Sequence, residues 1–284
     1  MALRLVLDTN VYSFGRIHDL ARLVERGLLL SVSEIAFTET IARSFREYRD
    51  GMRRGQARGK LFRRSKVIAP FLDPAYPVAL GAGGITRRIA AQTAGTRPNH
   101  AAERQSALLI AMWRVAVAHE FTDEEWAANA RVAEAWLTER DQAEFTVMRA
   151  VRGQRKPVGW STKPEAERLA IMRTSLAEFW GFTPAMTERL DAHVATTAYQ
   201  MLQWDTGART AKKNDGADGH LTQHIAEGSV VVTNDNRLID IVDSSGTFQA
   251  PWVRRLDDLE CLPEGLPWGE NARRQATSFT RAPR

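Results

Sequence analysis

The stretch "VVVTNDNRLIDIV", from Val230 to Val242, joins a β-branched apolar run to an amphipathic one through Thr233, Asn234 and Asp235. The apolar run predicts a buried strand, and the amphipathic part predicts a helix. The N-terminal "LRLVLDTN" follows the same plan, because its apolar run ends at Asp8. The carboxyl ends of parallel strands meet at one edge of a sheet, where ligands bind. We therefore expect the two aspartates at the same edge of one sheet.

The two ends of the chain both alternate predicted strands and helices. "RIHDLARLVERG" has helical spacing, "LLLSVS" is typical of a second strand, and a helical pattern begins at Glu34. Near the C-terminal end, "DGHLTQHIAEG" predicts a helix before the Val230 strand, and "PWVRRLDD" predicts a last short strand. The order strand, helix, strand, helix favours a parallel sheet covered by helices.

A long helical segment separates these two parts. "VIAPFLDPAYPVALGAGG" is rich in proline and glycine and is expected to be irregular, and from His100 to about Trp204 the pattern is helical almost throughout. We expect an α/β fold with a parallel sheet, interrupted by a mostly helical insertion. Residues 1–66 and 205–262 would form the α/β domain, residues 67–204 the insertion, and the aperiodic residues 263–284 a loosely held basic tail.

Composition limits the classes of function. Of the 284 residues, 44% are hydrophobic and 26% charged, which is typical of a globular protein. The net charge of +5 fits an anionic partner such as nucleic acid, although many soluble proteins share it. Cys261 is the single cysteine, which excludes an internal disulfide and a cysteine-rich zinc site. No stretch reaches the roughly 18 apolar residues of a membrane helix, so we expect a soluble, cytoplasmic protein that does not enter the membrane.

Four acidic residues are candidates for one site. Asp8 and Asp235 end strands, Asp218 lies near a predicted helix start, and Glu39 lies early in the helix after "LLLSVS". Carboxylates brought together repel one another, and Mg²⁺ or Mn²⁺, which prefer carboxylate and water oxygens, relieve that repulsion. Such ions activate water for phosphodiester displacement. For Asp235 and Asp218, capping of the following helix is the alternative.

These motifs resemble those of the PIN domain, a family of metal-dependent nucleases that includes many bacterial toxins. The matching stretches are "LVLDTNVY", "SVSEIAFTET", "ADGHLTQHIAEG" and "VVVTND", which cover under half of the chain. The resemblance implies an α/β/α sandwich and one catalytic metal site formed by Asp8, Glu39, Asp218 and Asp235, with Asn10, Thr233 and Asn234 orienting the carboxylates or water. Glu34 competes with Glu39 for its place, and Asp215 competes with Asp218 or joins it.

The resemblance also implies an activity and its partners. We expect a Mg²⁺- or Mn²⁺-dependent endonuclease that cuts RNA in preference to DNA, as a toxin or an RNA-processing enzyme. DNA stays open as a substrate, because metal-assisted hydrolysis does not use the 2′-hydroxyl. The helical insertion has no counterpart in a minimal PIN domain. It could shape a substrate channel, form a homodimer or hold an antitoxin-like protein inhibitor.

A basic stretch continues from the helix that carries Glu39. Its charge suits a phosphate backbone, and Phe45, Tyr48 and Phe62 could stack on bases. The expected nucleic-acid contacts are Arg46, Arg49, Arg53, Arg54, Arg58, Lys60, Arg63 and Arg64, with Lys212 and Lys213 beside Arg209 across the crevice. The alternative is a solvated helix face followed by a loop.

Other motifs favour competing functions less well. His220 and His224 have the i, i+4 spacing of metal ligands but lack the glutamate of a zinc protease, so we expect surface groups or groups that support the site. A PIN-like fold that binds nucleic acid or protein without cutting is the main alternative, and four clustered acids argue against it. A phosphatase with Asp8 as nucleophile would need an aspartate where this chain has Asn10.

Overall fold

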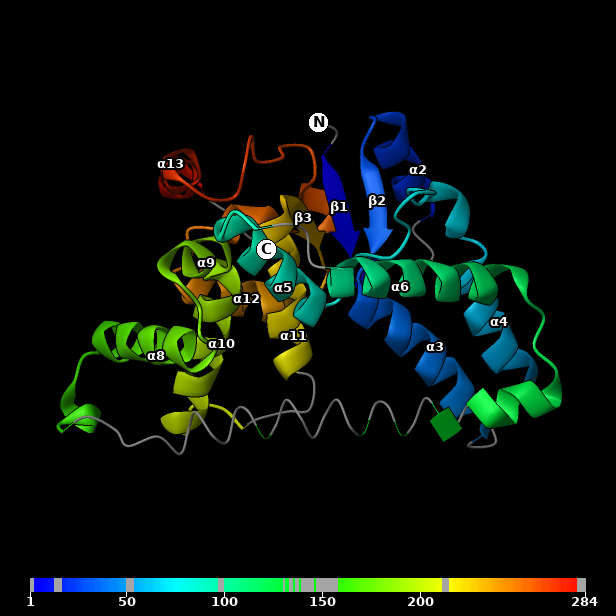
Figure 1. Cartoon of the computed structure of the whole chain (residues 1–284), viewed down its shortest axis with the longest axis horizontal. Coiled ribbons are helices and arrows are strands. Elements are labelled where there is room, and N and C mark those ends of the chain that lie inside the picture. The colour runs from blue at the N-terminus through cyan, green and yellow to red at the C-terminus, as the bar shows by residue number, and fades with distance from the viewer. Residues whose placement is uncertain are drawn as a thin grey trace.

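The computed structural model describes residues 3–12, 17–49, 54–96, 100–129, 131, 132, 135, 138, 146, 158–210 and 215–279. It is a mixed α/β fold in which helices greatly outnumber strands (Figure 1). The strands are β1 (Arg4–Leu7), β2 (Leu29–Val32), β3 (Ser229–Val232) and β4 (Val253–Arg254). They form one parallel sheet in the order β2-β1-β3-β4, which confirms the expected parallel sheet.

The register of the sheet aligns the ends of β2, β1 and β3. Leu7 pairs with Val32 on one side and with Val232 on the other, so Asp8 and Thr233 leave the sheet side by side. The chain runs from β1 to β2 on one side and later crosses to β3 on the other. The crevice between β1 and β3 is therefore the switch point at which ligands bind in open parallel sheets.

Helices from the first, middle and last parts of the chain surround this sheet. The first part contributes α1 (Thr9–Tyr12), α2 (Ile17–Glu25), α3 (Glu34–Arg49) and α4 (Arg54–Ser65). The middle contributes α5 (Ala82–Thr93), α6 (His100–Ala118), α8 (Glu165–Phe179), α9 (Pro184–Arg189) and α10 (Asp191–Asp205). The last part contributes α11 (Asp215–Leu221), the 3₁₀ helix Thr222–Glu227, α12 (Asn236–Ser244) and α13 (Glu270–Ser278).

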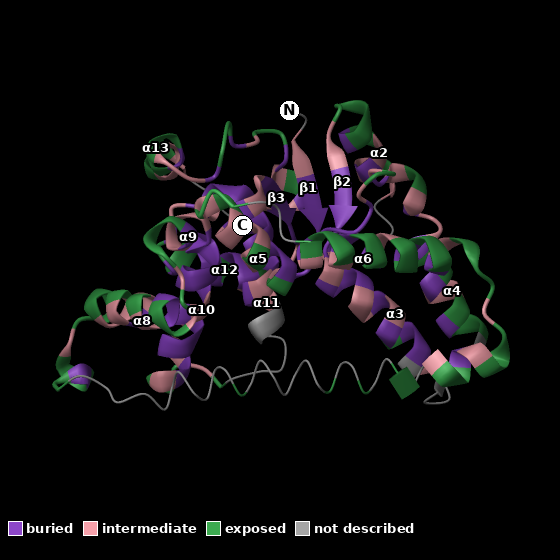
Figure 2. Cartoon of the chain, viewed as in Figure 1, coloured by how far each residue is buried: buried purple, intermediate pink, exposed green. Residues whose placement is uncertain are grey.

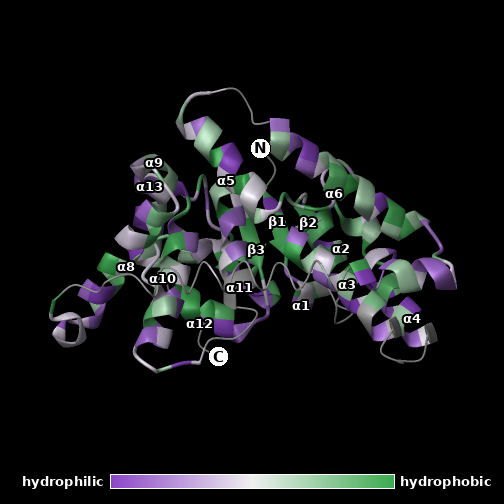
Figure 3. Ribbon diagram, turned by 60° about the horizontal axis from the view of Figure 1, so that its bottom comes forward, coloured by the Kyte–Doolittle hydropathy of each residue, from purple (hydrophilic) through white to green (hydrophobic). Residues whose placement is uncertain are grey.

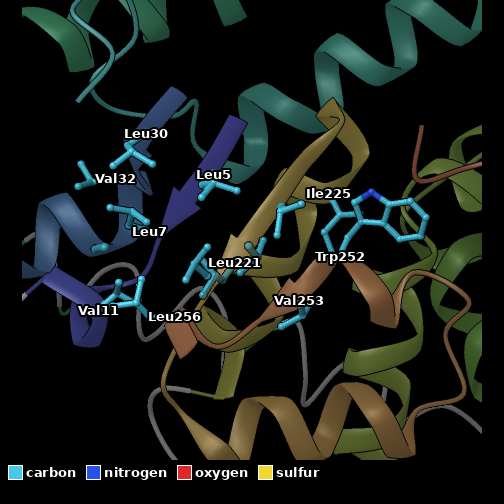
Figure 4. Packing of buried hydrophobic residues seen from close by; sticks show 14 of the residues in the cluster. Leu5, Leu7, Val11, Leu30, Val32, Leu221, Ile225, Trp252, Val253 and Leu256 are labelled. Atoms are coloured by element: carbon cyan, nitrogen blue, oxygen red, sulfur yellow. The ribbon is translucent and has the colours of Figure 1, made fainter. Parts of the chain in front are cut away.

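The sheet lies in the middle of the main hydrophobic core. Leu5, Leu7, Val230 and Val232 are fully buried, because both faces of the strands are covered (Figures 2 and 4). The buried strands are also the hydrophobic ones, since β1 and β2 are coloured as hydrophobic in the middle of the molecule (Figure 3). The apolar runs that predicted these strands are thus the runs that the fold buries.

The segment 67–204 takes part in this core. Leu109 and Trp113 of α6 and Ala192 of α10 belong to the same buried cluster as the strands. The ring of Trp113 packs edge-to-face on Phe37 of α3, with 5.4 Å between ring centroids. Residues 77–79 also hydrogen-bond to β2, since Val32 N donates to Pro77 O and Val32 O accepts from Ala79 N. This segment therefore completes the α/β core in addition to adding helices.

The expectation of an irregular segment is confirmed for residues 67–81, which contain no α-helix, and fails only at their end, whereas the expectation of a loosely held C-terminal tail was wrong. Helix α5 begins inside the glycine-rich run, where Gly84 is required because a Cβ would approach both Leu80 and Gln105 to 2.7 Å. Helix α13 lies in residues 263–284, which were expected to be loosely held, and its Ala272 is fully buried in the main core. No helix in the described residues has the length and apolar character needed to cross a membrane.

Candidate active site

The candidate site begins where β1 and β3 end. Asp8 N donates to Val232 O at 3.0 Å and Thr233 N donates to Arg254 O at 2.9 Å, so the sheet ladder continues one residue past each strand. Both backbones are therefore held in place at the point where the functional side chains leave them. In Figure 1 the arrowheads of β1 and β2 point toward the space between α3 and α11, which carry the two other acidic candidates.

Asp8 is held by three hydrogen bonds. Its Oδ1 accepts from Thr9 N at 2.6 Å, and its Oδ2 accepts from Asn10 Nδ2 and from the Thr233 hydroxyl, both at 2.8 Å. Asn10 Oδ1 in turn accepts from Asn234 N at 2.8 Å. These bonds join the end of β1 to the end of β3, and they give Asn10 and Thr233 the orienting positions that the sequence predicted.

Asp235 caps the helix that follows it. Its Oδ1 accepts from Arg237 N at 2.8 Å and from Leu238 N at 3.4 Å, so the capping alternative is correct for this residue. Capping also fixes the carboxylate at the sheet edge. Asn234 is held similarly, because its Oδ1 accepts from Leu256 N at 3.3 Å. Capping and a role in the site are compatible here.

Glu39 and Asp218 approach the same edge from α3 and α11. The Thr9 hydroxyl donates to Glu39 Oε2 at 3.4 Å, which links Glu39 to the residue after Asp8. Glu34 takes a different place, since its carboxyl group lies beside Gly81 at the start of α5. Glu39 is therefore the glutamate that joins the site. Asp218 lies on the described part of α11, whereas the side chain of Asp215 lies outside the described residues.

The four carboxylates share one electrostatic environment. Burial is the largest cause that raises the pKa of Asp8 to about 6, with hydrogen bonds from Thr233 and Thr9 opposing it and repulsion from Glu39 and Asp235 adding to it. Burial likewise raises the pKa of Asp218 to about 8, followed by repulsion from Asp235 and Asp8. Both groups hold a proton more tightly than an ordinary aspartate, chiefly because they are buried and in addition because neighbouring carboxylates repel their charge.

Arg209 supplies positive charge beside this acidic group. It lowers the pKa of Asp218 against the larger effects of burial and repulsion. Burial lowers the pKa of the Arg209 guanidinium itself, and its attraction to Asp218 and Asp235 opposes that shift. The sequence predicted Arg209, Lys212 and Lys213 at the far side of the crevice, and the two lysines lie outside the described residues.

The donor set fits a hard divalent cation by its chemistry. Four carboxyl side chains offer the oxygen ligands that Mg²⁺ and Mn²⁺ prefer, and a bound cation would favour the ionised forms of Asp8 and Asp218 over the protonated ones. As the described side chains stand, no three His, Cys, Asp or Glu groups among them are close enough to form a ready metal centre. The residues at the site thus provide the ligand types that a hard divalent cation prefers.

Two buried histidines, His193 and His224, lie near α11. His193 Nδ1 lies 2.9 Å from Gly219 O, directly after Asp218, and its ring stacks on Trp180 at 4.7 Å between centroids. His224 is also buried, so of the two places expected for it, the protein surface is wrong and a position supporting the site is left open. Burial is the main cause that lowers the pKa of both His193 and His224 to about 3, which keeps them neutral. Sequence reasoning missed His193, whose signal is a lone polar residue within a helical apolar pattern.

The basic stretch is divided between ion pairs and exposed side chains. Arg58 pairs with Asp123 at 2.6 Å and Lys60 with Glu47 at 2.8 Å, while Arg63 is exposed. Phe45 is buried, so its expected role in stacking on bases was wrong. Arg64 also lies on α4. Arg46 and Arg49 lie on α3 and Arg54 on α4, but their side chains are outside the described residues, and so is all of Arg53.

Comparison with protein-family models, curated proteins and solved structures finds no match for this chain.

Proposed function

We propose that this protein is a metal-dependent endonuclease that hydrolyses phosphodiester bonds at the edge of its parallel sheet. The observation that carries the proposal is the position of Asp8 and Asp235 at the β1–β3 switch point, with Glu39 linked to Thr9 and with Asp218 near enough to feel the charge of both aspartates. A fold gains no stability from gathering four carboxylates, so their presence there favours a ligand of positive charge. Resemblance to the PIN domain supports the same reading and extends it to an α/β/α sandwich.

The proposal assigns a part to each side chain. Asp8, Glu39, Asp218 and Asp235 would hold Mg²⁺ or Mn²⁺. When bound, such an ion supplies an activated water and stabilises the leaving oxygen. Thr233 and Asn10 keep the Asp8 carboxylate in one orientation through the hydrogen bonds to its Oδ2. Arg209 offsets part of the acidic charge, and in this proposal its guanidinium would attract a phosphate group.

The substrate in this proposal is nucleic acid, and RNA is favoured over DNA. Net charge of +5 and the basic helix α4 favour a polyanion, and α4 packs beside α3, which carries Glu39. The preference for RNA rests on the PIN resemblance alone. A binding-only fold is the second candidate, and the acidic cluster opposes it, because a module that merely binds phosphate is weakened by carboxylates in its groove.

The phosphatase alternative is weaker for a geometric reason. Asn10 stands where the second aspartate of such an enzyme would act as acid and base. Its amide is already engaged, donating to Asp8 Oδ2 and accepting from Asn234 N. A neutral amide held in this way has no proton to exchange with a leaving group.

Cleavage of end-labelled single-stranded RNA and DNA tests the proposal. Purified wild-type protein would be assayed with Mn²⁺, Mg²⁺ or EDTA beside Asp218→Asn, which removes charge without removing a helix cap. Asp240→Asn is the matched control, because Asp240 is exposed on α12. We expect metal-dependent cleavage by wild type and Asp240→Asn and at least a 100-fold loss in Asp218→Asn, about the loss seen when one stabilising group is removed from an active site. Equal activity of all three proteins would refute the proposed site.

A further inference from the structure

A cavity lies on α4, and none of the four acidic candidate residues lines it. It has a volume of about 290 Å³ and opens between α4 and the segment that follows α6. Its aromatic and basic lining includes Arg58, Phe62, Lys66, His119, Phe121 and Trp126. This volume is at the lower end of small-molecule sites, so the cavity suits one flat ring system and not a large cofactor. We call it the α4 cavity.

Its floor is a rigid aromatic cluster. Trp126 is 2% exposed and packs edge-to-face on Phe45 of α3, with ring centroids 4.6 Å apart. Phe121 meets the same Phe45 ring at 5.4 Å. At the rim, by contrast, Phe62 is 52% exposed, and the Lys66 ammonium lies 5.9 Å from the centre of its ring. A planar ligand that entered would meet aromatic groups both below it and beside it.

The charge around the rim favours an anionic ligand. Arg58 and Lys66 line the cavity, and Arg63 is exposed one residue from Phe62. Glu120 also lines it, and Arg58 pairs with Asp123 at 2.6 Å. Both partners of that pair are about half exposed, so solvent screens the pair and a phosphate group can replace the carboxylate at little cost. A flat ring attached to phosphate satisfies both the aromatic and the basic groups.

The α4 cavity is joined to the acidic site by α3. Glu39 and Phe45 lie six residues apart on this helix, a rise of about 9 Å. Helices α3 and α4 pack side by side, and α6 contacts both (Figure 1). A single strand could therefore pass from one place to the other over a short length.

We propose that the α4 cavity receives one unpaired nucleobase of a single-stranded substrate whose backbone is cut at the acidic site. This inference rests on the proposed nuclease function and adds to it. Stacking against Phe62 would hold the base without regard to its identity, since every base presents a π-face, while Lys66 would contact the adjoining phosphate. A base held in a duplex cannot enter, so the preferred substrate is single-stranded.

Binding in EDTA tests this inference separately from cleavage. The probe is a fluorescein-labelled single-stranded RNA oligonucleotide, followed by a series in which one position after another is made abasic, with affinity read from fluorescence anisotropy. Phe62→Ala should bind the intact strand about 10-fold more weakly than wild type, as expected for one lost base–aromatic stack. Phe62→Trp should retain affinity. Phe179→Ala is the matched control, because Phe179 is 44% exposed at the end of α8.

The abasic series adds a coupling that a merely structural role would not produce. One abasic position should weaken binding to wild type and to Phe179→Ala while leaving binding to Phe62→Ala unchanged. Equal affinities of Phe62→Ala and Phe179→Ala for the intact strand would overturn the inference, and so would the absence of any such position. If Asp218→Asn loses cleavage and Phe62→Ala binds RNA as wild type does, the nuclease proposal would be supported and the role of the α4 cavity rejected. An effect of Phe62→Ala without metal-dependent cleavage would keep the cavity and reject the nuclease.

Discussion

The Thr233 hydroxyl donates a 2.8 Å hydrogen bond to Asp8 Oδ2, although 225 residues separate the two along the chain. The parallel pairing of β1 with β3 brings them together, since Leu7 and Val232 lie opposite each other in the register. The same Thr233 oxygen accepts from Asp235 N at 3.1 Å. One small side chain thus links two of the four candidate ligands.

Replacing Thr233 by valine should move the pH dependence of activity. The hydroxyl lowers the pKa of Asp8 against the larger effect of burial, so its loss raises that pKa above about 6. The acidic limb of the pH–rate profile should shift toward higher pH, and the free energy of unfolding should fall by about 1 kcal/mol for the lost hydrogen bond. Thr233→Ser, which keeps the hydroxyl, is the control. A profile that coincides with wild type would show that the bond does not tune Asp8.

Asp235 should show two separable roles. Asp235→Asn keeps an oxygen that can cap α12 but removes the charge, whereas Asp235→Ala removes both. We expect both variants to lose stabilisation by Mn²⁺ in thermal unfolding. Only Asp235→Ala should also lose about 0.5–2 kcal/mol of stability in EDTA, as is usual when an N-cap is removed. Full Mn²⁺ stabilisation of Asp235→Asn would mean that this residue is a cap and nothing more.

The strand ends could be predicted because local sequence determines them. Each apolar run is short and stops at a polar residue. Because parallel strands end at the same edge of a sheet, Asp8 and Asp235 could be predicted to lie at one edge without knowledge of the fold. Asp8, Thr233 and Asn10 then came together as expected. By contrast, neither the position of Glu34 beside Gly81 nor the neutral His193 beside Gly219 has a local signature, because both depend on helix packing.

The missed helix α5 shows the same limit. Its glycines predict a loop when propensity alone is considered, yet Gly84 is there because α5 packs closely on Leu80 and Gln105. Phe45 was misjudged for a related reason: an aromatic residue in a basic stretch looks suited to stacking on bases until Trp126, 81 positions later, covers it. Contacts between distant segments decided both outcomes.

Two glycine-to-alanine substitutions should therefore have opposite effects. Gly84→Ala places a Cβ 2.7 Å from the Leu80 side chain and from Gln105 Oε1, and we expect a loss of about 1–3 kcal/mol. Gly55→Ala in α4 meets no atom within 4 Å, and it should raise stability by about 0.5–1 kcal/mol through helix propensity. Urea unfolding of the two variants and wild type measures both. Similar shifts in the two variants would contradict the close packing of α5.

The metal-free protein should lose stability as the pH rises. Burial, and then repulsion from Asp235 and Asp8, raises the pKa of Asp218 from 3.8 to about 8, so the folded state keeps a proton that the unfolded state has already released. The folded state therefore binds more protons throughout this window, and the free energy of unfolding falls as pH rises from about 4 to about 8. Asp8, whose pKa is raised to about 6, adds to the fall between about 4 and 6.

Asp218→Asn isolates this contribution. In EDTA at pH 8.5 the variant should be more stable than wild type by several kcal/mol, with a correspondingly higher Tm, and the difference should vanish near pH 4. Mn²⁺ should reverse the order at pH 8.5, because bound cation stabilises the ionised wild-type site and not the variant. Thermal unfolding across this pH range, with and without Mn²⁺, measures both effects. If Tm depends on pH in the same way for both proteins in EDTA, Asp218 does not have a raised pKa in the folded state.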